Sequence, residues 1–556
     1  MATASTRRAR KKGRQAPGAA KRASGGAAAP HAEPELTAGR EIPERAWAYA
    51  AAAVLLLALA LRLYAPEMKP LHHDEGVNGF FLTNLLREGR YAYDPANYHG
   101  PTLYYLTLPL AALAGLSTFV IRLVPALFGV GTVWLLLSLR RRVGAVAALA
   151  AAALVAVSPA CVFYSRYFIH EMPFVFFTLA LVVAALRFRE TGGASYLMLA
   201  SASAAMLFAT KETAFISAGT LGLAWLTVRL WERVVGGARA RGDEGGGPGG
   251  FAKLAAGGES SASAAVAGAA VLFVFIWVAF YSSFFTNGKG VADSFRALAV
   301  WRETGMSEFH GKPPGAYIEW LFREDAPILI LGLLGAPAAM FGRGRSRFAL
   351  FAAAWGFGLL AAYSLISYKT PWLVLNFVVP LAVAGGYAVQ EFGVWAARRL
   401  FPPGGPGRAW TAAAALAAVA CGASLYRTCV INFVEYDDDV KHPYVYSQTQ
   451  RGFLDLVREI ERVGERAGTK TPGFSTASPD YWPLPWYMRD NPRAGFEGRP
   501  NAPYDPQKTL AVVGKEEQAA MLERVLGDAY ARVGDFYPLR PGVRLILFAR
   551  RDLAPR

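Results

Sequence analysis

Long uninterrupted blocks of apolar residues are the feature of this sequence that most restricts its fold. The first block reads "AWAYAAAAVLLLALALRLYAP" and starts at residue 46. Similar blocks recur along the chain at roughly 18–24 residues each, the length that an α-helix needs to cross a bilayer. Charged residues make up only 18% of the 556 residues, whereas a soluble globular chain carries about 25%. The sequence therefore predicts an all-α polytopic membrane protein.

Eleven transmembrane helices are predicted from these blocks. They are expected at residues 46–65, 118–138, 144–163, 173–187, 195–210, 213–231, 263–284, 326–342, 348–366, 372–392 and 410–429. The segment "PTLYYLTLPLAALAG" at 101–115 is also apolar, but it is short for a membrane span. We expect this segment to lie along the membrane interface or to re-enter the membrane.

The distribution of arginine residues tests this count, because cytoplasmic loops of membrane proteins carry an excess of Lys and Arg. With the N-terminus in the cytoplasm, every dense arginine cluster between spans falls on the cytoplasmic side. A further span at 101–115 would turn all later clusters outward, so eleven is the better count. Basic cytoplasmic loops also account for the net charge of +17, and no nucleic-acid partner is predicted.

Three regions of different composition follow from this topology. Residues 1–45 are a basic, Ala- and Gly-rich segment, expected to be a disordered cytoplasmic tail. Residues 46–429 form the transmembrane domain, with a Gly-rich cytoplasmic linker at about 236–261. Residues 430–556 are more polar, and stretches such as "GFLDLVREIERVGE" and "VRLILFA" predict a small α/β domain. The odd number of spans places this domain, and the C-terminus, outside the cytoplasm at the plasma (inner) membrane.

Acidic residues collect on the outer side of this topology. The stretch "LHHDEGVNGFF" places Asp74 and Glu75 beside His73 at the start of an amphipathic helix, and "SRYFIHEMPF" places Glu171 before the fourth span. Acids at a helix mouth can simply be solvated, and Glu171 could pair with Arg166 in its own turn. Three acids on one face, close to histidines that tune carboxylate pKa values or ligate a metal, instead favour a functional site.

Basic and aromatic residues occupy the same face. The candidate substrate-binding residues are His73, His99, Arg122, Arg166, His170, Lys211, Tyr368 and Lys369. A lysine at a helix end commonly extends to the membrane interface, but lysine also binds phosphate as a point charge. A carboxylate can deprotonate an acceptor hydroxyl or hold a divalent metal ion, while cations hold a departing phosphate. This combination predicts sugar transfer from a lipid-phosphate donor.

The motifs in their order along the chain resemble the GT-C superfamily of integral-membrane glycosyltransferases. "YHGPTLYYL", "RLVPALFG" and "SRYFIHEMP" follow the acidic first loop, as in protein O-mannosyltransferases and lipid A aminoarabinose transferases. "SYKTPWLVLN" and "SPDYWPLPWYMRD" resemble a prokaryotic subfamily labelled flippase-activity-associated proteins. The chain departs from the superfamily at His99-Gly100-Pro101, where a His-Pro-Pro-type motif is usual, and at Glu171, where aspartate is usual.

The resemblance implies a cavity for a polyprenyl-phosphate-linked sugar and assigns roles to matching positions. Asp74 matches the first-loop catalytic acid, with Glu75 beside it, and Glu171 matches the second acid. His99 and Lys369 fall where the family contacts the donor phosphate. A divalent metal ion is a candidate cofactor. The expected activity is a membrane glycosyltransferase that acts on a protein, lipid or glycan acceptor, as part of a glycan assembly pathway.

Two other classes of protein would use the same residues differently. A flippase, or a flippase accessory protein, for lipid-linked sugars would bind the headgroup without transferase activity and would need chiefly the cations. A scaffold for polymer export would use the outer domain to recruit partners. Transfer chemistry alone requires a carboxylate near the sugar, so the acids distinguish the enzyme from both alternatives.

Overall fold

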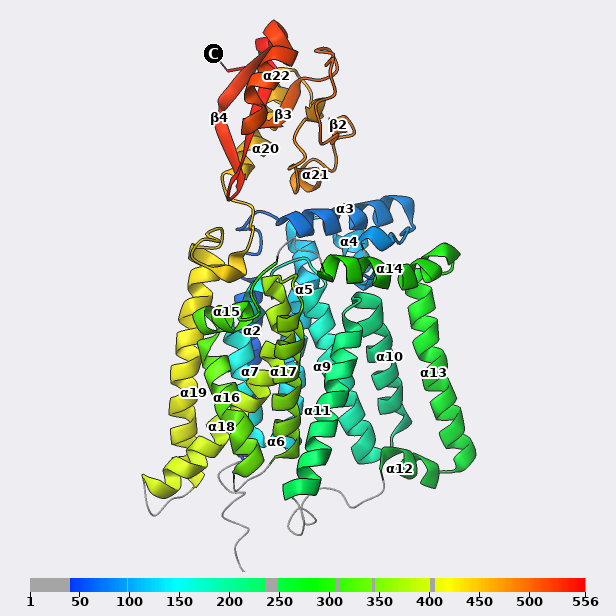
Figure 1. Cartoon of the computed structure of the whole chain (residues 1–556), viewed down its shortest axis with the longest axis vertical. Coiled ribbons are helices and arrows are strands. Elements are labelled where there is room, and N and C mark those ends of the chain that lie inside the picture. The colour runs from blue at the N-terminus through cyan, green and yellow to red at the C-terminus, as the bar shows by residue number, and fades with distance from the viewer. Residues whose placement is uncertain are drawn as a thin grey trace, which may run out of the picture.

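The computed structural model describes residues 41–97, 99–235, 249–306, 311–342, 346–400 and 406–555. Within these residues, helices stand side by side in a bundle, and a small α/β domain lies beyond one end of it (Figure 1). The predicted tail at 1–45 falls almost entirely outside the described residues, and so does the first half of the predicted linker.

Eight helices of the described chain are long and apolar enough to cross a membrane. They are α2 (Glu44–Leu63), α5 (Thr118–Ser138), α9 (Glu171–Thr191), α11 (Ala214–Val235), α13 (Glu259–Tyr281), α17 (Arg347–Leu365), α18 (Leu375–Arg399) and α19 (Pro406–Cys429). Two bent pairs raise the number to ten if each is one span: α7 (Ala145–Val157) with α8 (Pro159–Ser165), bent by 57°, and α15 (Ala316–Glu324) with α16 (Ala326–Phe341), bent by 111°.

The predicted count of eleven requires one more helix, α10 (Ala194–Thr210). It has 17 residues and runs beside α9 and α13 in Figure 1. The apolar segment near residue 101 forms α4 (Thr102–Ala114), a short helix at the end of the bundle that carries the α/β domain. A multi-pass membrane fold is therefore present, and each predicted span corresponds to a helix or a bent helix pair.

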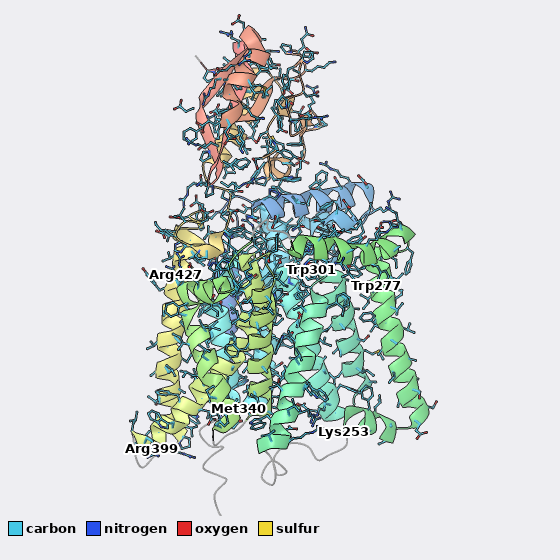
Figure 2. All side chains as sticks on the ribbon, in the orientation of Figure 1. Lys253, Trp277, Trp301, Met340, Arg399 and Arg427 are labelled. Atoms are coloured by element: carbon cyan, nitrogen blue, oxygen red, sulfur yellow. The ribbon has the colours of Figure 1, made fainter. Side chains whose placement is uncertain are left out.

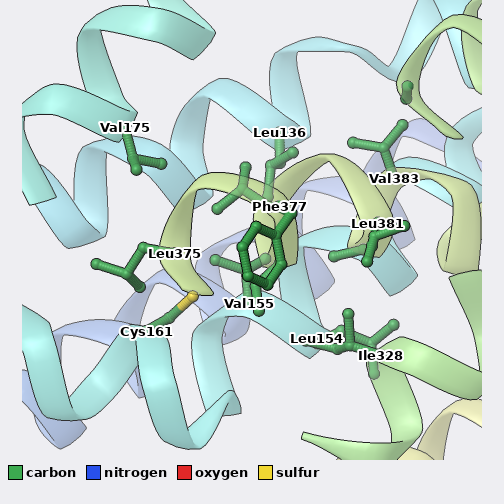
Figure 3. Close-up of a cluster of buried hydrophobic side chains, with 14 of the residues drawn as sticks. Leu136, Leu154, Val155, Cys161, Val175, Ile328, Leu375, Phe377, Leu381 and Val383 are labelled. Carbon is green, nitrogen blue, oxygen red and sulfur yellow. The ribbon is translucent and has the colours of Figure 1, made fainter. Parts of the chain in front are cut away.

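Helix α18 forms the centre of the bundle and is buried along almost its whole length. Figure 3 shows its side chains Leu375, Phe377 and Leu381 against Val155 of α7 and Ile328 of α16. Glycines let the helices approach closely: a Cβ on Gly386 would lie 2.3 Å from the carbonyl oxygen of Ala147. Small residues at helix contacts are the usual packing device in membranes, because lipid provides no hydrophobic force between helices.

An outer layer of helices covers the end of the bundle nearest the α/β domain. It contains α3 (His73–Glu88), α4, α14 (Gly288–Met306) and α15. At the opposite end lie α6 (Arg140–Val143) and α12 (Gly250–Ala256), and Figure 2 shows Lys253 and Arg399 there. Helix α12 corrects the sequence prediction that the whole of 236–261 is a flexible linker. Basic residues of the described chain, among them Lys253 and Arg399, thus lie at the end remote from the α/β domain.

The C-terminal domain contains a five-stranded sheet with strand order β2-β1-β3-β5-β4. Its elements are α20 (Phe453–Arg466), β1 (Phe474–Thr476), α21 (Leu484–Tyr487), β2 (Ala494–Gly495), β3 (Ala511–Lys515), α22 (Ala519–Leu526), β4 (Tyr530–Arg540) and β5 (Val543–Arg550). β1 pairs in parallel with β2 and β3, and β5 is antiparallel to β3 and β4. The small α/β domain expected after residue 430 is therefore present.

Candidate active site

The first turn of α3 contains the two adjacent acids Asp74 and Glu75, whose side chains lie in different environments. His72 precedes the helix, and its Nδ1 accepts a hydrogen bond from the backbone nitrogen of Asp74 at 3.1 Å. The carboxylate of Glu75 accepts a hydrogen bond from the backbone nitrogen of His72 at 3.0 Å. These reciprocal bonds form a capping box, which satisfies two of the free N–H groups at a helix start. The cap fixes the directions in which Asp74 and Glu75 leave the helix.

Glu75 points into the protein, where Arg122 of α5 binds it. Arg122 donates from Nε at 2.7 Å and from Nη2 at 2.6 Å, and the backbone nitrogen of Phe168 donates at 2.9 Å. Both charged side chains are almost completely buried. Burial alone would raise the pKa of Glu75, but the guanidinium of Arg122 more than offsets this, and the pKa lies below its usual range. Glu75 and Arg122 thus form a buried ion pair outside the described cavity lining, and their predicted catalytic and substrate-binding roles stay predictions.

Arg166 is likewise occupied by the protein itself. It donates to the backbone carbonyl oxygens of Leu61 at 3.2 Å and Ala65 at 3.0 Å, and it makes no ion pair with Glu171. Arg122 donates to the carbonyl oxygens of Pro66 and Lys69 in the same loop. Arg166 also lies outside the described cavity lining, and its predicted role in substrate binding stays a prediction. The two arginines hold the loop between α2 and α3, because a buried carbonyl oxygen without a partner is costly.

A cavity of about 290 Å³ opens at the outer ends of these helices. Most of the predicted site residues meet in its lining although they come from five separate stretches of the chain. Those present are His73, Asp74, His99, His170, Glu171, Lys211 and Tyr368. The cavity therefore brings together the first turn of α3, the start of α9, the end of α10 and the loop after α17.

Two ion pairs cross the cavity wall. Lys211 Nζ lies 2.5 Å from the Glu171 carboxylate, and both side chains are buried. His99 Nδ1 lies 3.0 Å from the carboxylate of Glu212. Charges buried at the edge of the membrane are tolerated when they are paired in this way. Lysine has three N–H donors, so Lys211 retains capacity for a second acceptor beside Glu171.

Asp74 is the acid that faces the cavity in an accessible position, with 39% of its side-chain surface exposed. Burial of the group, followed by the negative charge of Glu171, raises its pKa to about 6. Burial and the nearby Arg540 lower the pKa of His73 to about 4, so this ring is neutral at pH 7. Asp74 is thus ionised at neutral pH, yet basic enough to take up a proton, which suits a general base.

His170 supplies a further polar atom to the cavity. Its Nε2 lies 3.0 Å from the carbonyl oxygen of Gly100, to which it donates. Its Nδ1 is buried and has no hydrogen-bond partner among the described residues. In a neutral ring with the proton on Nε2, Nδ1 is an acceptor. This nitrogen is therefore an unsatisfied acceptor enclosed in the protein beside the cavity.

The structure also shows which further residues line the cavity and which lie only beside it. Lys369 lies beside the cavity but not in its described lining, and its Nζ donates to the carbonyl oxygen of Ile366. Its predicted contact with phosphate stays a prediction. Sequence reasoning did not select Glu212, Trp301 or Trp372, which do line the cavity. Glu212 follows Lys211 in "TKET" at an outer helix end, and that position was the available signal.

The residues that the structure describes form no cluster of metal ligands. No group of three or more His, Cys, Asp or Glu side chains in the described parts of the chain could hold a metal ion. Glu171 and Glu212 already have basic partners. The donor set therefore does not fit a resident divalent metal ion, and no step of the mechanism below passes through one.

Comparison with known proteins identifies the fold. The family model for dolichyl-phosphate-mannose-protein mannosyltransferase matches residues 98–235. The crystal structure of ArnT from Cupriavidus metallidurans bound to undecaprenyl phosphate superposes with a TM-score of 0.61 at 14% sequence identity, covering 92% of this chain and 100% of that chain. The chain has the fold of the GT-C membrane glycosyltransferases.

A second GT-C relative has the same arrangement. The oligosaccharyltransferase of Archaeoglobus fulgidus, tethered to an acceptor peptide, superposes with a TM-score of 0.51 at 14% identity, covering 88% of this chain and 73% of that chain. Another structure of that enzyme is a complex with zinc and sulfate. No protein of curated function shows significant sequence similarity to the chain. The expected GT-C fold is therefore confirmed, and the mannosyltransferase match covers the segment that contains His99, Glu171 and Lys211.

Proposed function

We propose that this protein is a membrane glycosyltransferase that moves a sugar from a polyprenyl-phosphate donor to an acceptor hydroxyl on the extracytoplasmic face. One observation carries the proposal: an accessible carboxylate, Asp74, shares a cavity with the buried cation Lys211 at the outer end of a GT-C fold. The mannosyltransferase family match and the undecaprenyl phosphate bound to ArnT support a donor of this class.

The geometry supports a direct displacement. Asp74 takes the proton of the acceptor hydroxyl as the acceptor oxygen forms a bond to the anomeric carbon of the sugar. The bond from that carbon to the donor phosphate oxygen breaks, and its electron pair leaves with the polyprenyl phosphate. Lys211 stabilises the charge on the departing phosphate.

Glu171 acts on this reaction through its neighbours. It holds the ammonium group of Lys211 in place at 2.5 Å, and its charge helps to raise the pKa of Asp74. Glu75 and Arg122 orient the helix that carries Asp74. Among the acids predicted to be catalytic, Asp74 is therefore the one that touches the substrate.

The membrane orientation belongs to the same proposal. The N-terminus lies in the cytoplasm, the cavity and the C-terminal domain lie outside, and the membrane is the plasma (inner) membrane. The basic residues at the end remote from the α/β domain support this orientation. The flippase alternative is not favoured, because the family match and both solved relatives belong to transferases.

The test is the substitution Asp74→Asn in the purified full-length protein. Loss of a general base lowers the transfer rate by about 10²–10⁴-fold, whereas affinity for the donor changes little, since a carboxylate does not attract a phosphate. Transfer is measured from a panel of radiolabelled polyprenyl-phosphate sugars to cell-envelope acceptors. Asp528→Asn is the matched control, because the Asp528 side chain is fully exposed and does not belong to the cavity lining. An unimpaired Asp74→Asn enzyme would contradict the proposal, and so would a wild type inactive with every donor.

A further inference from the structure

Three aromatic side chains of the α/β domain, Trp482, Tyr481 and Phe496, form a continuous row that we call the aromatic strip. The ring centres of Tyr481 and Trp482 are 5.6 Å apart, and those of Tyr481 and Phe496 are 5.7 Å apart. Each pair of ring planes is inclined by only 34°. All three side chains are partly exposed. The three rings follow one another with similar inclination, and each leaves part of its surface accessible to solvent.

The strip begins at the rim of the cavity. The Trp482 ring lies 6.2 Å from the ring of His73, which lines the cavity beside Asp74. Phe80, on the next turns of α3, is 44% exposed, and its ring lies 5.9 Å from Trp482. In Figure 1, α21 lies directly above α3, and β2 lies on the same side of the domain. A chain-like ligand lying along the strip would therefore reach Asp74 at its end.

Close contacts hold the strip at this distance. A Cβ on Gly76 would lie 2.7 Å from the Cβ of Pro483, and one on Gly79 would lie 2.5 Å from Trp486. These two glycines face the domain one turn apart on α3, so the helix and the segment after Trp482 pack without intervening side chains. At the other end of α3, Arg87 forms an ion pair with Asp490 at 3.2 Å. The strip is thus positioned on the helix that carries the catalytic acid.

Polar groups flank the rings. Asp480, next to Tyr481, pairs with Lys515 at 3.1 Å and with Arg540, and all three side chains remain between 21% and 23% exposed. Apolar ring faces bordered by fixed hydrogen-bonding groups match a sugar, which has one face of C–H groups and a rim of hydroxyls. A peptide that adds a strand needs a free sheet edge, and the edge strand on this side, β2, has only two residues.

We propose that the aromatic strip binds the saccharide part of the acceptor and directs its terminal hydroxyl to Asp74. The acceptor is then a glycan or a glycan-bearing molecule. The identification of this ligand as the acceptor rests on the proposed function. The binding of a saccharide to the aromatic strip does not depend on it. Binding of a saccharide to the strip can be measured without donor and without transfer.

The experiment measures retention of the full-length protein, in detergent, on immobilised cell-envelope oligosaccharides and, in a parallel arm, on immobilised peptides. The test variant is Tyr481→Ala/Trp482→Ala. The control is Phe536→Ala, an aromatic residue of β4 that is 42% exposed and does not belong to the strip. Removal of aromatic anchors weakens saccharide binding by about tenfold or more. Tyr481→Phe/Trp482→Phe keeps the ring faces and retains most of the affinity, which separates stacking from loss of folding.

Every result of this experiment either supports or contradicts the inference. Saccharide binding that is lost in the alanine variant, retained in the phenylalanine variant and unchanged in Phe536→Ala supports it. No saccharide binding by wild type, equal binding by the alanine variant, or binding confined to the peptide arm overturns it. Asp74→Asn separates this inference from the proposed function, because it removes the proposed base and leaves the three rings of the strip in place. If the wild-type protein binds saccharide but transfers no sugar, the proposed function is contradicted and the inference about the aromatic strip still holds.

Discussion

At the scale of single residues, the site depends on how differently two adjacent acids are placed. Successive helix positions point about 100° apart, so Asp74 faces the cavity while Glu75 faces Arg122 in the interior. The sequence shows an acidic pair and cannot show this division, because the direction of each side chain depends on where α3 lies. The same reasoning applies to Arg122 and Arg166: their charge is visible in the sequence, but the carbonyl oxygens that they bind come from a loop about 50 to 100 residues away.

The pKa of Asp74 predicts how the reaction depends on pH. A base must be unprotonated to accept the acceptor proton, and burial with the charge of Glu171 raises this pKa from the usual 3.8 to about 6. The transfer rate should therefore fall as the pH drops through about 6 and should level off above it. The measurement is kcat against pH for wild type, with Asp528→Asn as a control that keeps the same midpoint. A rate that does not change through this range would contradict the assignment.

The same shift has a consequence for stability. Because the pKa in the folded protein lies above its value in the unfolded chain, the ionised carboxylate costs stability once the pH rises through this interval. Asp74→Asn removes that cost. Its unfolding temperature at pH 7 should therefore not lie below that of wild type, so lost activity in this variant reports lost chemistry.

At the scale of elements, the placement of α3 rests on a buried ion pair. Arg122→Ala leaves the Glu75 carboxylate buried and unpaired, which should cost about 3–5 kcal/mol of stability. Arg122→Lys should not restore the loss, because lysine lacks the fork that binds both carboxylate oxygens and the loop carbonyls. Thermal unfolding in detergent measures these effects. A double substitution, Glu75→Gln/Arg122→Met, should lose less than Arg122→Ala, and a larger loss would contradict the role of the pair.

Elements with a regular pattern were predictable, and irregular ones were not. The amphipathic helix α3, the helix α20 and the strand β5 lie where their sequence patterns indicate. β1 has three residues, too few for a pattern to be detected. The span expected at 326–342 is extended by α15 at a bend of 111°, and there Asp325 accepts hydrogen bonds from Ser158 and from the backbone of Ala160. Such a partner, more than 160 residues away, has no local signal.

At the scale of the whole molecule, the two ends of the bundle predict its orientation. Reporter insertions after Arg142, near residue 246 and after Arg399 should report the cytoplasm, and a reporter at the C-terminus should report the outside. The physical reason is that basic loops remain on the cytoplasmic side, and Lys253 and Arg399 lie opposite the α/β domain (Figure 2). A cytoplasmic C-terminus would contradict the span count and would place the cavity on the wrong side for the proposed donor.

The contacts between the α/β domain and the loop before α3 join segments of the chain that are synthesised at different times. The hydroxyl of Tyr487 accepts a hydrogen bond from the backbone nitrogen of Leu71 at 3.0 Å, and Gln448 donates to the carbonyl oxygen of Pro70 at 3.0 Å. A ribosome makes Asp74 early and these supports last. A growing chain thus carries its catalytic acid through most of translation without the groups that hold it. The placement of α3 is therefore completed only after the α/β domain has been synthesised and has folded onto the loop before this helix.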